Sequence, residues 1–150
     1  MKKEQSDFLV TPMTFEDIQS IEENFSEQFD KFWSIDTLKS DFQDNQSHYF
    51  VAKVDQEIIG FAGIKVILDV ADIMNIAVRI DKRHLGIASL LLESLIEHAR
   101  SLHCSKILLE VNEKNIPAIC LYEKYQFHQI AVRKKYYHQT DDAIIMEKCL

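Results

Sequence analysis

Glycine is scarce in this chain, with only three in 150 residues. A dinucleotide-binding fingerprint, Gly-x-Gly-x-x-Gly near the start of a βαβ unit, would need all three within six residues, whereas they stand at positions 60, 63 and 86. The sequence also lacks the Walker loop, Gly-x-x-x-x-Gly-Lys-Ser/Thr, whose backbone N–H groups cradle nucleotide phosphates. The two best-known glycine-rich phosphate sites are therefore excluded.

Cysteine is equally sparse: Cys104, Cys120 and Cys149 are odd in number and form no Cys-x-x-Cys pair. This pattern argues against a disulfide scaffold or a zinc ribbon and favours a reduced, cytoplasmic protein. His98 and His103 lie five residues apart in a predicted helix, a spacing that places them poorly to share one metal ion. We expect no metal cofactor.

Long apolar runs are missing too, since none approaches the ~20 residues of a membrane span. The polar start of the chain lacks the apolar region of a signal peptide, so we expect no membrane partner. The net charge of −7 argues against nucleic-acid binding, because phosphate backbones require clustered positive charge. It suits a cationic acceptor, such as an amine or a basic peptide. The length fits one domain, residues 1–150.

The most informative segment present is the loop Arg83-His84-Leu85-Gly86-Ile87-Ala88. Residues 73–78 before it form a short apolar run that predicts a strand. After it, apolar residues recur every three or four positions and predict a helix. A loop between a strand and a helix leaves N–H groups unpaired in the first helical turn, which favours an anion such as phosphate. Gly86 permits close approach of the ligand.

The apolar periodicity along the chain predicts the order β-α-α-β-β-β-α-β-α-β-β, an α/β fold. Thr14, with Asp17 three residues later, predicts the N-cap of the first helix. Asp55-Gln56 predicts a hairpin turn. Strands are expected at residues 8–12, 48–54, 57–67, 71–78, 106–111, 129–137 and 143–148, and helices after Thr14, at 35–42, after the loop and at 116–125.

Three residues downstream each have a chemical and a plain interpretation. Glu110 interrupts an apolar strand: burial would raise its pKa toward that of a general base, whereas a strand end would leave it in water. Asn115 precedes Ile116-Pro117 and is a favoured helix N-cap. Tyr122 is either a core aromatic or an acid able to protonate a departing thiolate.

The loop resembles the pyrophosphate-binding loop of the GNAT acyltransferases, Gln/Arg-x-x-Gly-x-Gly/Ala. Residues 108–127 resemble the stretch LEVR-x-x-N…A-x-x-LYE-x-x-GF of its RimI-like branch, the ribosomal-protein alanine N-acetyltransferases. Residues 60–63 and 75–78 are similar to the "GFA" and "NIAV" strands of that branch, and residues 133–137 and 142–146 to its "R-x-x-YY" and "DAIIM" ending. The resemblance spans residues 8–148 and includes the element order.

The resemblance implies a GNAT fold, with a mixed, partly splayed central sheet flanked by helices, that binds acetyl-CoA where two parallel strands separate. It implies that Glu110 acts as the base through water, and that Tyr122 is the acid that releases coenzyme A by direct transfer in a ternary complex. Asn115 would contact the pantetheine arm. The other cofactor contacts implied are the backbone of Ile76, Ala77 and Val78, and the loop residues Arg83, His84, Leu85, Gly86, Ile87, Ala88 and Ser89.

The implied acceptor is a protein N-terminal peptide, with the N-terminal Ala of a small-subunit ribosomal protein as first choice. Alternatives are a lysine, a polyamine or another small amine, and a non-catalytic CoA-binding module on the same fold. The branch has Pro-Trp-Ser where this chain has Phe32-Trp33-Ser34, and proline where His138 stands, which puts the acceptor in doubt. The candidate acceptor residues are Trp33, Arg133, Tyr136 and Tyr137.

Overall fold

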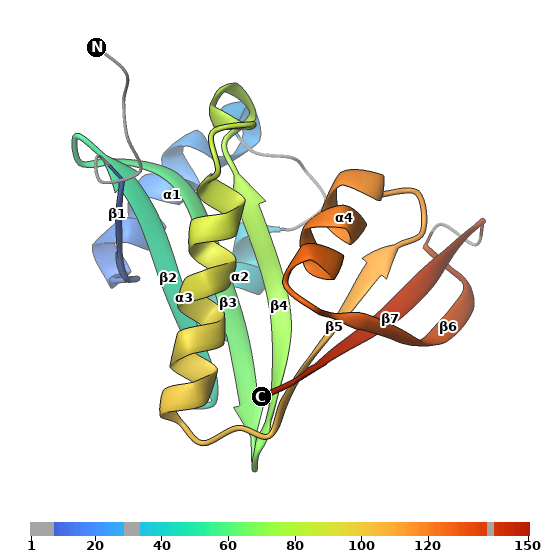
Figure 1. Cartoon of the computed structure of the whole chain (residues 1–150). Coiled ribbons are helices and arrows are strands. Elements are labelled where there is room, and N and C mark those ends of the chain that lie inside the picture. The colour runs from blue at the N-terminus through green and yellow to red at the C-terminus, as the bar shows by residue number, and fades with distance from the viewer. Residues whose placement is uncertain (1–7, 29–33, 138–139) are drawn as a thin grey trace.

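The computed structural model describes residues 8–28, 34–137 and 140–150. They form one seven-stranded sheet in the order β1-β2-β3-β4-β5-β7-β6, with helices on both faces (Figure 1). The elements are β1 (Leu9–Pro12), α1 (Phe15–Gln28), α2 (Ile35–Gln43), β2 (Ser47–Val54), β3 (Glu57–Ile67), β4 (Val70–Val78), the 3-10 turn η2 (Ile80–Lys82), α3 (Ile87–Ser101), β5 (Lys106–Asn112), α4 (Ile116–Lys124), β6 (His128–Tyr137) and β7 (Asp141–Cys149).

The order of helices and strands predicted from the sequence is confirmed. Thr14 and Asp17 cap α1 reciprocally: the Asp17 N–H donates to Thr14 Oγ1 (3.1 Å) and the Thr14 N–H donates to Asp17 Oδ2 (2.9 Å). Asp55 and Gln56 have φ values of 50° and 67°, as a two-residue turn between twisted strands requires. The 3-10 turn η2 was not predicted.

The sheet separates in its middle, between β4 and β5. Strands β1 to β4 pair antiparallel, and so do β5, β7 and β6. The parallel pairing of β4 with β5 is limited to residues 70–72 against 106–108, and the two strands then diverge (Figure 1). The expected mixed and partly splayed sheet is confirmed.

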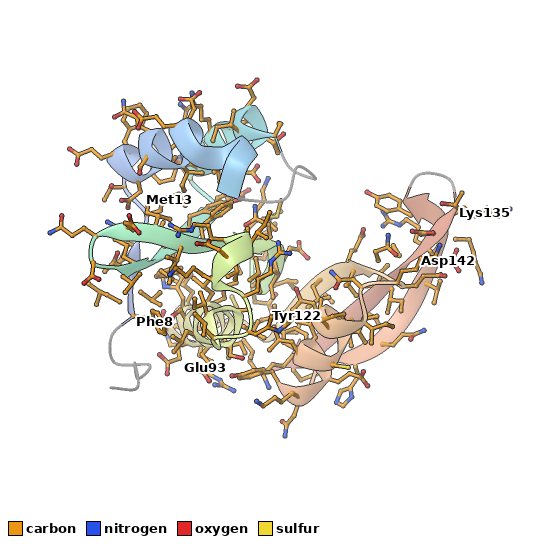
Figure 2. All side chains as sticks on the ribbon, turned by 90° about the horizontal axis from the view of Figure 1, so that it is seen from above. Phe8, Met13, Glu93, Tyr122, Lys135 and Asp142 are labelled. Atoms are coloured by element: carbon orange, nitrogen blue, oxygen red, sulfur yellow. The ribbon has the colours of Figure 1, made fainter. Side chains whose placement is uncertain are left out.

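Helices α1 and α2 lie on one face of the β1–β4 half and α3 on the other, as the view from above shows (Figure 2). Ile18 and Leu38 bury fully on the first side, against strand residues such as Val51. Within α1, the buried residues Ile18 and Ile21 are three positions apart, as on one face of a helix. Packing of this face against the sheet stabilises the helix.

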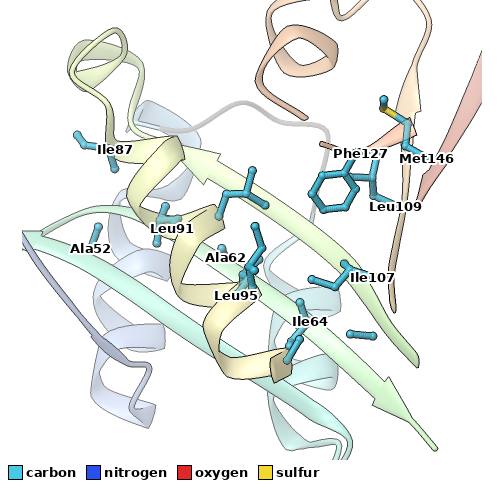
Figure 3. Packing of buried hydrophobic residues seen from close by; sticks show 14 of the residues in the cluster. Ala52, Ala62, Ile64, Ile87, Leu91, Leu95, Ile107, Leu109, Phe127 and Met146 are labelled. Atoms are coloured by element: carbon cyan, nitrogen blue, oxygen red, sulfur yellow. The ribbon is translucent and has the colours of Figure 1, made fainter. Parts of the chain in front are cut away.

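The larger apolar cluster lies under α3 and continues to α4 (Figure 3). Leu91 and Leu95 of α3 are fully buried, and Phe127, after α4, packs in the same cluster as Leu109 of β5. Burying one such side chain contributes roughly 1.5–3 kcal/mol. Helices α3 and α4 therefore lie on the same face of the sheet, on either side of the gap between β4 and β5. No helix in residues 8–28, 34–137 and 140–150 is both long and apolar enough to span a membrane.

Candidate active site

A cavity of about 540 Å³ lies between the end of β4, the loop before α3, and α4. It brings together nearly all of the cofactor residues predicted from the sequence, with the proposed acid. Its lining comprises Ile76, Ala77, Val78, Lys82, Arg83, His84, Gly86, Ile87, Ala88, Ser89, Asn115, Pro117, Ala118, Leu121 and Tyr122. Leu85 is not part of the lining and is half exposed.

The loop before α3 has the backbone conformation that an anion site needs. His84 and Gly86 have φ values of 67° and 81°, in the left-handed region, where glycine is the residue without strain. Helix α3 begins directly after Gly86, with no side-chain cap and no acidic residue in its first turn. The N–H groups of that turn therefore keep their capacity to bind an anion, and Lys82 and Arg83 add positive charge.

The β4 side of the cavity presents an open strand edge. Residues 76–78 pair with β3 on one side. They do not pair with β5 on the other, because the pairing of β4 with β5 ends at Asp72. Their edge toward the gap is thus available to an extended ligand that carries amide groups, in the way that a peptide adds a strand to a sheet.

On the α4 side, Asn115 serves as the N-cap: its Oδ1 accepts a hydrogen bond from the Ala118 N–H (3.3 Å). The capping interpretation is confirmed, and the same side chain also lines the cavity. The cap uses the amide oxygen, so the NH2 group can donate to a ligand. Tyr122 is half buried, lies edge-on to Phe127 with 5.8 Å between ring centroids, and faces the α3 side in Figure 2.

Glu110 does not line this cavity. The alternate residues 107, 109 and 111 are buried in the cluster under α3 and α4, so Glu110 lies on the opposite face of β5. Its side chain is 33% exposed and forms an ion pair with Arg133, with 3.0 Å between Glu110 Oε1 and Arg133 Nη2. The sequence left burial and exposure of Glu110 open. The carboxylate is partly exposed because β5 has already left β4 and, among the described residues, the apolar cluster of α1 and α2 does not reach it.

Of the predicted acceptor residues, Arg133 contacts Glu110 and Tyr136 contacts Arg133. The guanidinium carbon of Arg133 sits 4.8 Å from the centroid of the Tyr136 ring, a cation–π distance. Tyr137 ends β6, opposite Asp141. Trp33 lies outside the described residues, as do Phe32 and His138.

A polar network that the sequence did not reveal ties the end of β5 and the loop after it to the start of β7. Asn112 Nδ2 donates to Asp141 Oδ2 (3.1 Å), and the Asp142 N–H donates to Glu113 Oε2 (3.1 Å). Lys114 pairs with Asp141 at 2.8 Å, and its hydrogen bond lowers the pKa of that carboxyl. The partners lie up to 29 residues apart, too far for any sequence pattern to indicate the pairing. The network fixes the hairpin that carries Arg133.

No group of three or more His, Cys, Asp or Glu side chains placed to hold a metal ion occurs in the described part of the chain. The phosphate loop with Lys82, Asn115 and Tyr122, all singled out in the sequence, thus line one cavity, and Pro117, Ala118 and Leu121 are the lining residues that the sequence did not indicate. Glu110, Arg133 and Tyr136 form a second group on the opposite face of β5 and β6.

Known proteins resemble this chain over most of its length. Residues 18–127 match the Acetyltransferase (GNAT) family. A relative from Bacillus subtilis (strain 168) is 32% identical over 139 residues, or 91% of this chain and 92% of its own. The ribosomal protein bS18-alanine N-acetyltransferase of Escherichia coli (strain K12) is 37% identical over 117 residues, or 76% and 78%. The crystal structure of the Escherichia coli ribosomal-protein-S18-alanine N-acetyltransferase superposes with a TM-score of 0.86 at 29% identity, covering 95% and 93%.

Proposed function

We propose that this chain, which belongs to the Acetyltransferase (GNAT) family, acetylates the α-amine of a protein N-terminus. Family membership makes it an acetyl-CoA-dependent N-acetyltransferase. Its preferred acceptor is the N-terminal alanine of a small-subunit ribosomal protein, a proposal supported by the Escherichia coli relative of that specificity. The free state of all three cysteines suits action in the cytoplasm. Residues 1–150 act as one catalytic domain.

The cavity at the split of the sheet is the observation that carries the proposal. Its donor set fits acetyl-CoA: a diphosphate matches the first turn of α3 with Lys82 and Arg83, and an amide-bearing arm matches the open edge of residues 76–78. Asn115 can donate to the same arm from the opposite wall. Bound in this direction, acetyl-CoA supplies an activated thioester at the gap.

The two catalytic groups then act from opposite sides of the gap. Glu110, on the face away from α4, takes a proton from the acceptor amine, through a water if the distance requires one. The neutral nitrogen attacks the thioester carbonyl, so that a C–N bond forms and the C–S bond breaks, and the nitrogen releases its surplus proton to water. Tyr122, in the cavity, gives its phenolic proton to the departing sulfur. Both substrates must be present together, and no covalent enzyme intermediate forms.

The chemistry favours an α-amine over a lysine. With a pKa of about 7.7–8, roughly a tenth to a sixth of an N-terminal amine is neutral at pH 7. A lysine with a pKa near 10.4 is neutral in only about four molecules in ten thousand. Glu110 is partly exposed and already paired with Arg133, an arrangement suited to the less demanding acceptor. The net charge of −7 also attracts a cationic N-terminal segment.

The test is coenzyme A release from acetyl-CoA with a panel of acceptors. The panel contains peptides with a free N-terminal Ala, Ser or Met, the same peptides with blocked N-termini, a lysine peptide and spermidine. We expect turnover with the free Ala peptide and none with its blocked form. Turnover with the lysine peptide or spermidine alone would show that the proposed acceptor is wrong and that the chain still transfers the acetyl group. Tight acetyl-CoA binding without turnover on any acceptor would contradict catalysis and favour a CoA-binding module.

A further inference from the structure

At the end of β4, Arg79 binds Asp81 through two parallel hydrogen bonds. Arg79 Nε donates to Asp81 Oδ1 and Nη2 donates to Oδ2, each at 2.7 Å. The third guanidinium nitrogen lies 3.6 Å from Oε2 of Glu57, the first residue of β3. The Arg79 side chain is only 12% exposed, whereas both carboxylates are largely in water. A two-pronged pair of this kind holds one geometry, unlike most surface ion pairs.

The backbone around the pair leads directly into the proposed diphosphate loop. The Arg79 N–H donates to the Ile59 carbonyl (2.8 Å), which ties this point to β3, and the Arg79 carbonyl accepts from the Lys82 N–H (2.9 Å). The intervening turn η2 has no side-chain cap. The Arg79–Asp81 pair is thus a side-chain interaction that spans the start of the turn, and Lys82 and Arg83 follow it into the cavity wall.

The pair also affects the charge that a bound diphosphate would meet. The hydrogen bonds from Arg79 lower the pKa of Asp81 to about 2, and this ionised carboxylate directly precedes Lys82 of the cavity lining in the chain. Without the guanidinium, its charge would repel a diphosphate. Arg79 offsets that charge while it holds the turn.

We propose that Arg79 is a positioning residue for the diphosphate of acetyl-CoA, acting through Asp81 on the loop of residues 80–86. This inference rests on the proposed cofactor site. It assigns two tasks to Arg79, which are to fix the η2 turn and to neutralise Asp81. The two tasks predict different results for different substitutions.

Arg79→Gln removes both tasks and leaves the Asp81 carboxylate uncompensated. We expect it to weaken acetyl-CoA binding by roughly tenfold or more, in proportion to the loss of charge-assisted hydrogen bonds. Asp81→Asn loses the rigid pair but also the repelling charge, so its loss is smaller. The double substitution therefore binds acetyl-CoA more tightly than Arg79→Gln alone.

Proline at position 80 separates the mechanical task from the electrostatic one. Ile80 is half exposed and begins the 3-10 turn, and Arg79 before it has an extended ψ of 136°, which a following proline tolerates. Adding Ile80→Pro to Asp81→Asn stiffens the turn without the ion pair. We expect it to recover much of the lost acetyl-CoA affinity.

The decisive readout compares acetyl-CoA with acetyl-pantetheine, which lacks the diphosphate. We expect Arg79→Gln to raise the Kd and KM for acetyl-CoA and to leave the KM for acetyl-pantetheine unchanged. Lys65→Gln breaks an ion pair with Asp44 (3.0 Å) away from the cavity and serves as the matched control. An equal loss with both thioesters, or no loss with either, overturns the proposal. If the unsubstituted protein binds no acetyl-CoA, the proposed cofactor site fails instead.

Discussion

Glu110 of β5 and Arg133 of β6 form an ion pair, with 3.0 Å between Oε1 and Nη2, although β7 lies between their strands. The guanidinium also stacks over Tyr136. The carboxylate proposed as the base therefore carries a cationic partner on the face where an acceptor would arrive. A positively charged N-terminus can take the place of the half-exposed guanidinium at this carboxylate.

Glu110→Gln tests the base directly. The amide keeps the size of the side chain but cannot take a proton, so we expect kcat to fall by roughly 10²–10⁴. Acetyl-CoA affinity should not change, because Glu110 lies outside the cavity. Coenzyme A release and calorimetric titration measure the two quantities. Glu123→Gln, at an exposed position of α4, is the control, and an unchanged rate in Glu110→Gln would exclude the assigned role.

Tyr122→Phe tests the acid. Loss of the hydroxyl removes the proton for the departing thiolate while the ring still packs against Phe127. We expect a fall in kcat of roughly 10²-fold or more with a nearly unchanged Kd for acetyl-CoA. Tyr125→Phe is the matched control: this tyrosine follows the same helix, but its hydroxyl donates to Glu93 Oε1 (2.6 Å) and it is not in the cavity lining. Equal effects of the two substitutions would refute the assignment.

Local patterns in the sequence predicted the order of elements well, because each depends on neighbours close in the chain. The capping pair Thr14 and Asp17 and the hairpin turn at Asp55-Gln56 are examples, since three residues or fewer decide them. The loop before α3 was recognisable for the same reason: Gly86 stands where the backbone needs a left-handed residue and a helix begins directly after it.

The sequence could not indicate features that depend on where strands far apart in the chain pair or separate. The pairing of β4 with β5 ends at Asp72, and no feature of either strand alone marks that point. Its consequence is that Glu110 is partly exposed rather than buried. Its ion pair with Arg133 likewise requires β7 to lie between β5 and β6, an order that periodicity does not contain.

Gly63→Ala should destabilise the fold by packing alone. A Cβ atom at this position would lie 2.4 Å from Cε2 of the Tyr49 ring, far inside contact distance. The ring is 5% exposed and its hydroxyl donates to Asp41 Oδ2 (3.2 Å), so it cannot move away freely. We expect a loss of about 1–3 kcal/mol in the free energy of unfolding, measured by urea denaturation. In a Tyr49→Leu background the loss should shrink, and an undiminished loss would show that the ring is not its cause.

The pair His48 and His98 should make stability depend on pH. His98 Nε2 and His48 Nδ1 are 3.0 Å apart in a hydrogen bond, with the Phe50 ring 5.2 Å from that of His98. Burial lowers the pKa of both imidazoles, and the nearness of His48 lowers that of His98 further. In the unfolded chain each returns to an ordinary pKa of about 6.5.

Because the unfolded chain takes up these protons first, the contribution of the pair is complete above about pH 7 and is lost as the pH falls through about 6.5 toward the lower folded-state pKa values. Carboxylates with lowered pKa, such as Asp17, act only at more acidic pH, near 4 and below.

Thermal unfolding between pH 8 and pH 5 should therefore show a falling Tm. The fall should be smaller in His98→Gln, because glutamine can keep a hydrogen bond to His48 but does not titrate. His128→Gln, at an exposed position of β6, should follow the unsubstituted protein. If His98→Gln loses Tm as steeply as the unsubstituted protein does, another group must carry the pH dependence.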